Sequence, residues 1–161
     1  MSDQAYINSL YRSAANYKSQ ASYWRGQASA AQSTIDALIL SLPISVSELG
    51  YANEVNSRFP SLDTAIATMD SDINSLATAL STQLEDNGAN SQITMLDDTY
   101  TDHATSAKNA CSQLIEQLQQ EIASLEQQIA AATSQRNTAQ ANASTASANA
   151  SWCYSRISAL S

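Results

Sequence analysis

Apolar side chains recur at alternating three- and four-residue spacings along most of this 161-residue chain. This spacing places them on one face of a helix, and a sustained alternation of this kind is typical of left-handed coiled coils. We therefore predict a first helix over about residues 3–42, ending before Pro43. Its apolar face comprises Ile7, Leu10, Ala14, Tyr17, Ala21, Trp24, Ala28, Ala31, Ile35, Leu38 and Leu42.

Residues 43–60 contain both prolines of the chain, one at each end. Proline has no backbone N–H and destabilises the interior of a helix, so this segment is predicted to be a joint with at most a short helix in it. A second helix is predicted over about residues 61–85, and the Asp-Asn-Gly sequence at 86–88 predicts a turn after it. The apolar face of the second helix comprises Leu62, Ile66, Met69, Ile73, Leu76 and Leu80.

The last part of the chain predicts the longest helix, because no glycine or proline follows Gly88. We predict a third helix over about residues 90–160, in which the regular spacing is interrupted at 96–104 and at 114–122. Its apolar face comprises Leu96, Tyr100, Ala104, Ala107, Cys111, Leu114, Leu118, Ile122, Leu125, Ile129, Ala132, Arg136, Ala139, Ala143, Ala146, Ala150, Cys153, Ile157 and Leu160.

The first and second helices together match the third helix in length. We therefore predict one all-α domain over residues 1–161, an elongated antiparallel coiled-coil hairpin in which the first two helices lie in tandem along the third. In this alignment Trp24 faces Ala143 and Leu62 faces Leu118. Bulky side chains of the first helix thus lie opposite an alanine-rich segment, as a close-packed seam requires. The predicted seam includes Tyr17, Trp24, Leu38, Leu42, Leu118, Leu125, Ala143 and Ala150.

The alternative architecture is a compact four-helix bundle. It requires the third helix to break at residues 133–137, where Thr, Ser and Asn lower the helix propensity. The regular spacing of apolar residues continues through this segment, which favours the hairpin.

Charge is scarce and unevenly distributed. Only 14% of the residues are charged, and the formal net charge of −8 argues against a nucleic-acid partner, which requires clustered Lys and Arg. Residues 36–126 hold fourteen of the fifteen acids against Arg58 and Lys108, whereas the remaining bases lie toward the termini. A chain that folds back on itself would therefore have a basic pole and an acidic pole.

Candidate chemistry is weak. The single histidine, His103, lies near Asp98 and Asp102, but no cysteine stands at coordinating spacing from it, and we interpret this cluster as a solvated acidic turn. With only one histidine, no catalytic set of nucleophile, general base and orienting group can be assembled. We therefore predict a protein that is not an enzyme and uses no cofactor or metal. Cys111 and Cys153 are interpreted as small seam residues, too far apart on one helix for a disulfide.

The N-terminal segment has no continuous apolar region of the kind that signal peptides have. The most apolar run, residues 35–46, is interrupted by Asp36 and Pro43 and is shorter than a membrane span requires. We therefore predict a cytoplasmic protein without stable membrane insertion, or one that is exported without a cleaved signal peptide. A pore-forming hairpin would need a longer apolar segment.

Most aromatic residues lie close to the two termini, which meet in the predicted hairpin. Because a seam rich in alanine buries little apolar surface, we expect part of this aromatic surface to bind a companion helix. The candidate partner interface comprises Tyr6, Tyr11, Tyr23, Trp152 and Tyr154. Tyrosines that lie half-covered along their own helix are the alternative interpretation.

A family resemblance accompanies this architecture. The acidic helical hairpin, with a Leu/Ile/Gln/Ser-rich coil such as residues 115–129, resembles the small helical partner proteins of bacterial type VII (ESX) secretion. These include WXG100-like proteins and the accessory subunits of LXG toxins, and Trp24-Arg25-Gly26 matches the W-x-G string. The family's C-terminal Y-x-x-x-D/E signal is missing, because Ser158 follows Tyr154 at that spacing. The resemblance implies an adaptor, chaperone or targeting partner of a secreted toxin.

The alternative function is a self-assembling structural rod, such as a filament subunit or a phage-tail component. In such an assembly the basic pole of one molecule would meet the acidic pole of the next, giving homo-oligomers that depend on salt. The adaptor instead predicts a complex with a helical domain of a larger protein.

Overall fold

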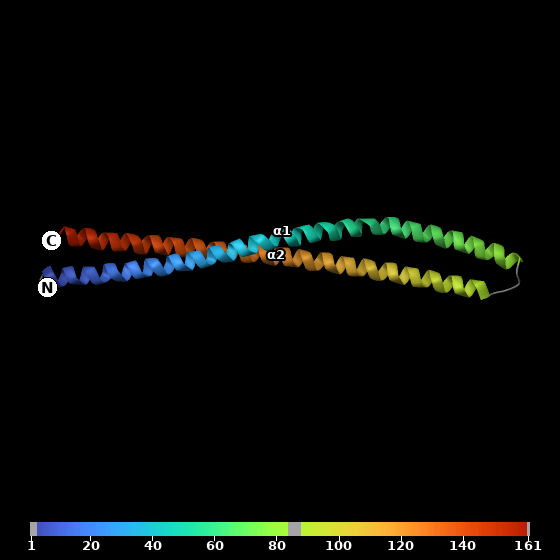
Figure 1. The fold of residues 1–161 in the computed structure, drawn as a ribbon, viewed down its shortest axis with the longest axis horizontal. Helices are drawn as coiled ribbons and strands as arrows, with labels where there is room; N and C mark the ends of the chain where they lie inside the picture. Colours follow the sequence, from blue (N-terminus) through green and yellow to red (C-terminus); the bar gives the residue numbers. More distant parts are fainter. Residues whose placement is uncertain (1–2, 84–87, 161) are drawn as a thin grey trace. The chain divides into compact units, whose positions relative to one another are not determined.

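The computed structural model describes residues 3–83 and 88–160, and these form an all-α helical hairpin of two long helices packed together (Figure 1). Helix α1 spans Asp3–Gln83 and helix α2 spans Gly88–Ser158. The turn predicted at 86–88 lies outside the described residues, except for Gly88, where α2 begins.

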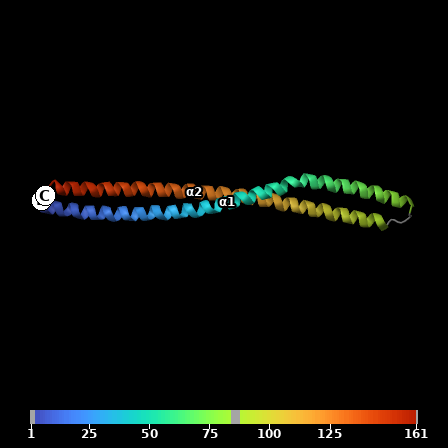
Figure 2. The ribbon, with the colours of Figure 1, turned by 45° about the horizontal axis from the view of Figure 1, so that its top comes forward.

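The hairpin divides into two compact units, where the sequence predicts a single domain. Unit 1 consists of residues 1–43 and 123–161, and unit 2 consists of residues 44–122. In each unit a segment of α1 lies antiparallel to a segment of α2, and Figure 2 shows these pairs from a second side. The antiparallel direction follows from the contacts in unit 1, where Lys18 meets Tyr154 and Arg25 meets Ser147.

The predicted division of the first half into two helices with a joint at 43–60 is wrong, because α1 is continuous through both prolines. The reason is visible in the burial pattern. The 3-4 spacing of the first helix does not stop at Pro43, and the covered positions continue in the same register at Ser45, Leu49, Ala52, Phe59, Ile66, Ile73 and Ala77. Packing this continuous face against α2 offsets the roughly 3 kcal/mol that an interior proline costs a helix.

The continuity of α1 changes the pairing in unit 2. The predicted alignment places Leu62 opposite Leu118, because it assumes that residues of the joint leave the helix. None does, and Lys108 instead donates a hydrogen bond to Asp63 Oδ1 at 2.6 Å. The same shift places Ala77 in the seam rather than the neighbouring Leu76, which is exposed.

The interruption predicted at 114–122 is absent, because the covered positions Ala104, Lys108, Cys111, Ile115, Leu118 and Ile122 alternate in steps of four and three. The interruption predicted at 96–104 includes residues whose side chains lie outside the described part, and Leu160, which was predicted in the seam, is exposed. Ile115 lies in the seam, whereas Leu114, which the sequence analysis placed there, is exposed. The four-helix alternative is wrong as well, since α2 passes through residues 133–137 without a break.

Unit 1 has a core of small side chains with larger aliphatic ones near its ends. Leu10, Ala14, Cys153 and Ile157 form a buried cluster close to the termini, with Tyr17 packed against it. Alanines dominate the rest of the seam, so the two helices approach closely and dispersion contacts replace a thick hydrophobic layer. The other buried residues of unit 1 are Ala21, Ala28, Ala31, Ile35, Ala132, Ala139, Ala143, Ala146 and Ala150.

The substitution Pro43→Ala should stabilise the protein, because it restores a backbone donor and removes a steric clash inside a helix. We expect the free energy of unfolding to rise by about 1–3 kcal/mol in urea titrations followed by circular dichroism. Ser47→Ala, at an exposed position of the same helix, serves as the control and should change stability by less than about 0.5 kcal/mol. Were residue 43 in a loop, Pro43→Ala would lower stability instead.

Candidate interaction surfaces

The five predicted interface aromatics all lie at the surface of unit 1, with Tyr23 and Trp152 the most exposed at 59% each. They do not form one patch. If Ile7 is position a and Leu10 position d of a heptad, Tyr11 falls at position e and Tyr6 at position g, on opposite sides of the seam.

The e positions of the two antiparallel helices meet on one side of unit 1. On this side the Lys18 ammonium lies 4.9 Å from the centre of the Tyr154 ring, and Arg25 donates a hydrogen bond to Ser147 at 3.0 Å. An open groove of about 350 Å³ runs between these residues. Tyr11 occupies position e one heptad before Lys18. This side therefore combines two tyrosines, Tyr11 and Tyr154, with the cations of Lys18 and Arg25.

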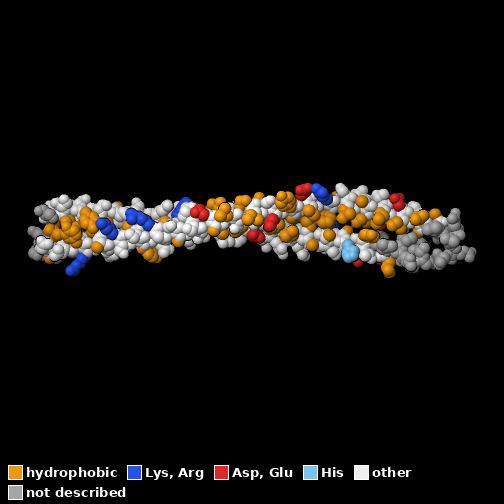
Figure 3. All heavy atoms as spheres, in the orientation of Figure 1, with side chains coloured by type: hydrophobic (Ala, Val, Ile, Leu, Met, Phe, Trp, Pro, Cys, Tyr) orange, Lys and Arg blue, Asp and Glu red, His pale blue; other side chains and the backbone are white. Residues whose placement is uncertain are grey.

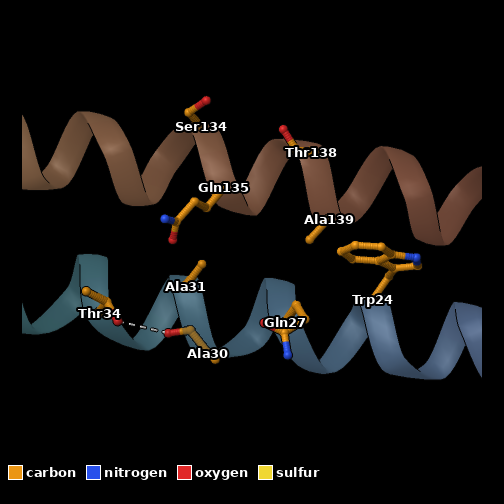
Figure 4. A pocket seen from close by; sticks show the side chains of 9 residues that line it. All are labelled: Trp24, Gln27, Ala30, Ala31, Thr34, Ser134, Gln135, Thr138 and Ala139. Carbon is orange, nitrogen blue, oxygen red and sulfur yellow. Dashed lines mark hydrogen bonds between the residues drawn. The ribbon is translucent and has the colours of Figure 1, made fainter.

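The opposite side of unit 1 carries Trp24, as Figure 4 shows. The indole lies over α2 next to Ala139, and the Tyr23 ring meets it edge-on, with ring centroids 5.1 Å apart and planes at 71°. The adjoining groove, of about 490 Å³, is lined by small and polar side chains such as Gln27 and Ser134. The heptad positions of Tyr6 and Trp152 place them on this side too. The sequence analysis treated the five aromatics as one interface, whereas they lie on two opposite sides of unit 1.

The residues predicted to form the seam are all covered to some degree. Leu118, Ala143 and Ala150 are buried, and Tyr17, Trp24, Leu38, Leu42 and Leu125 are half-buried. One polar residue joins them, since Arg136 donates a hydrogen bond across the seam to Gln32 Oε1 at 2.9 Å. The charge of Arg136 is thus held at the seam by a neutral acceptor.

Unit 2 exposes a surface whose residues, apart from Val55 in the predicted joint, the sequence analysis assigned to the seam. Val55, Leu62, Met69 and Leu76 are spaced seven residues apart at position g of α1, and each is between 37% and 59% exposed. Tyr100 and Leu114 lie at position g of α2 and are 51% and 47% exposed. We call these six residues the apolar stripe, and Figure 3 shows hydrophobic side chains along this unit.

The two halves of the apolar stripe lie on the same side of unit 2. Val55 and Leu114, one from each helix, line one open groove of about 620 Å³ together with Tyr51, Cys111 and Leu118. The lining is almost entirely apolar, with Glu48 at one end. In antiparallel helices the g positions adjoin one another, which places the remaining residues of the stripe on this side too.

The other side of unit 2 is polar at the corresponding positions. The e positions of α1 and α2 there include exposed asparagine, threonine, serine and glutamine residues: Asn53, Asn74, Thr105, Ser112 and Gln119. The exposed apolar residues at this set of positions are Val46, Pro60 and Ala67, all smaller than the leucine, methionine and tyrosine residues of the apolar stripe. Unit 2 is therefore amphipathic as a pair of helices, with one apolar and one polar flank.

Thiols and ionisable groups add no reactive constellation within the described part of the chain. Cys153 is buried in unit 1, and Cys111 is half-buried in unit 2 with its Sγ 3.4 Å from the Ala52 carbonyl oxygen. Among residues 3–83 and 88–160, no three His, Cys, Asp or Glu side chains come together in a way that could hold a metal ion. The three residues His103, Asp98 and Asp102 lie exposed on α2.

Helix α1 contains one apolar segment that meets the length and composition of a membrane span. An 18-residue window within Gln4–Ala79 has a mean hydropathy of 1.3, and 17% of this window is buried. Helices of proteins in aqueous solution satisfy the same criterion, so this segment is compatible with a membrane and with water.

Comparison with known proteins identifies no relative. No family model matches this chain, and neither the curated proteins nor the solved structures contain a match. The interaction surfaces therefore rest on the geometry of the two units alone.

Ala143→Leu should destabilise unit 1, because Ala143 is buried on the α2 face between Ala139 and Ala146, which both line grooves with Trp24. Overpacking of this kind costs about 1–3 kcal/mol, measured as the free energy of unfolding in urea. Ala141→Leu adds the same side chain at an exposed position of α2 and should leave stability within about 0.5 kcal/mol. Equal effects of the two substitutions would contradict the close contact at this point of the seam.

Proposed function

We propose that this protein is a non-enzymatic helical interaction protein, which acts as an adaptor, chaperone or targeting partner by receiving a helix from another protein. The observation that carries this proposal is the apolar stripe of unit 2. Exposed large apolar side chains at four successive g positions of α1, together with Tyr100 and Leu114 at g positions of α2, form a surface that a third helix can cover with knobs-into-holes packing.

The interior of unit 2 supports this proposal. Within the described part of this unit the buried residues are Ser45, Ala52, Ala77 and Leu118, so the seam contains a single large buried side chain. Asp63 and Lys108 face each other across it, and Asp70 also occupies a seam position. A pair of helices with so little buried apolar surface gains stability by covering the large residues beside the seam.

The type VII resemblance provides a class of partner. Accessory subunits of that kind lie beside the N-terminal helical domain of a secreted toxin, so we propose such a domain as the source of the docking helix, met in the bacterial cytoplasm. Tyr11, Tyr154 and the cations beside them would give the partner a second contact, on unit 1.

Site-specific photo-crosslinking in the source cells tests the proposal. A photoreactive phenylalanine analogue in place of Leu62 should give one predominant adduct with a different protein, identified by mass spectrometry, because residue 62 lies in the centre of the stripe. The same analogue in place of Val46, on the polar flank of unit 2, should give little of this adduct. Equal labelling from both positions, or adducts with the same chain alone, would contradict an adaptor role for the stripe.

The charge distribution favours a second candidate, the self-assembling rod. Unit 2 contains twelve acids against two bases, whereas residues 1–43 and 123–161 contain five bases against three acids. Unit 1 of one molecule could therefore attract unit 2 of the next.

The rod predicts that the purified chain forms large assemblies at low salt and dissociates at high salt, because exposed charges are screened by ions. Size exclusion coupled to light scattering measures this directly. A mass that stays that of one chain at both salt concentrations would exclude the rod and leave the adaptor as the remaining function.

A further inference from the structure

We propose that the apolar stripe binds a single amphipathic helix of another protein whose apolar face is flanked by lysine or arginine. This inference rests on the proposed function and specifies the chemistry of the partner. It follows from three properties of unit 2: the one-sided distribution of its apolar residues, the length of the stripe and the charge that surrounds it.

The one-sided distribution sets the number of docking helices. The stripe occupies the g flank of both helices, whereas the e flank holds polar residues on α2 and polar or small apolar residues on α1. A helix laid in the groove between Val55 and Leu114 touches α1 and α2 at once and completes a three-helix bundle. A second helix on the opposite flank would bury asparagine and threonine side chains without compensation.

The length of the stripe sets the length of the docking segment. From Tyr51, which lines the groove, to Leu76 the exposed apolar positions extend over 26 residues of α1, or about 38 Å of helix. A partner helix of about four heptads covers this distance. Its own apolar residues would recur every three or four positions, as those of the seam do.

The charge around the stripe sets the flanks of the partner. Glu48 lines the groove itself, Glu121 lies at the neighbouring g position of α2 and accepts a hydrogen bond from Ser45 at 2.8 Å, and Asp72 lies next to the stripe at position c. Lysine or arginine beside the apolar face of the partner would meet these carboxylates.

The two bases of unit 2 are already paired with acids. Arg58 donates a hydrogen bond to Glu54 at 2.6 Å, and Lys108 contacts Asp63. The free charges placed beside the stripe are therefore the carboxylates of Glu48, Asp72 and Glu121, because Arg58, at position c on the same side, is paired with Glu54. Two copies of this face would bring like charges together, which disfavours a second copy of the chain as the occupant.

Synthetic helices test the partner chemistry on the full-length protein. The probe is a fluorescent peptide of about four heptads with leucine at a and d and lysine at e and g, where the lysines also prevent the peptide from pairing with itself. One matched peptide has glutamate in place of each lysine. Another keeps the lysines and has serine in place of half the leucines. Binding is followed by fluorescence anisotropy at physiological salt.

We expect saturable one-to-one binding of the basic probe, and binding weaker by about tenfold or more for each of the two matched peptides. The double variant Leu62→Gln with Met69→Gln should bind the basic probe about tenfold more weakly or worse, since it removes two exposed apolar contacts without touching the seam. Val46→Gln on the polar flank should bind the probe like the unchanged protein, and circular dichroism confirms that all variants are folded.

Three results would overturn the inference. The serine-containing peptide binding as well as the probe would mean non-specific charge attraction, and the glutamate peptide binding as well would remove the requirement for basic flanks. A dimer of the chain in sedimentation equilibrium that the double variant dissociates would mean that a second copy covers the stripe. The photo-crosslink from position 62 to a different protein would be unaffected by the first two results, so the adaptor function is tested separately.

Discussion

The seam between α1 and α2 is the contact on which every other feature of this protein depends. Among the residues whose burial the structure describes, it follows one 3-4 register along α1, through both prolines, and over residues 104–157 of α2, through the low-propensity segment. Because a helix of this length cannot bury its apolar face against itself, the pairing with the other helix supplies most of the stability of both. The register of the seam then determines which side chains remain outside it.

The two units place different side chains at this seam. In unit 1, alanine lies opposite larger side chains, so that Trp24 fits over Ala139 and the core is closed by the cluster around Leu10 and Cys153. In unit 2, large seam residues such as Phe59 and Ile66 stay half-buried, small or polar residues such as Ala52 and Asp63 occupy other inward positions, and further large apolar residues lie beside the seam. Unit 1 therefore buries more of its seam than the described part of unit 2 does.

The apolar stripe of unit 2 is bordered by charged side chains. The flank of unit 2 that carries the apolar stripe is bordered by Glu48 and Glu121, and the bases of the unit are held in pairs with Glu54 and Asp63. Apolar contact supplies affinity over such a surface, and the surrounding charge selects among helices of similar hydrophobicity. The apolar stripe and its acidic border together distinguish this flank from the isolated exposed residues that most proteins have.

The amino-acid pattern alone was sufficient to predict an all-α hairpin, the helical seam from Ile7 to Leu42 and the one from Leu125 to Ile157, since a 3-4 spacing can be satisfied only by helices that share a face. It was insufficient at Pro43 and Pro60, where local propensity indicates a break but the continuing register of covered residues maintains the helix. That single difference shifted the pairing partner of Leu62 and moved Leu62, Met69 and Leu76 from the interior to the surface. Residues 66 and 73 are covered in either register, so the pattern could not distinguish the two; only the packing of α1 against α2 did, because it chooses which of two adjacent positions faces inward.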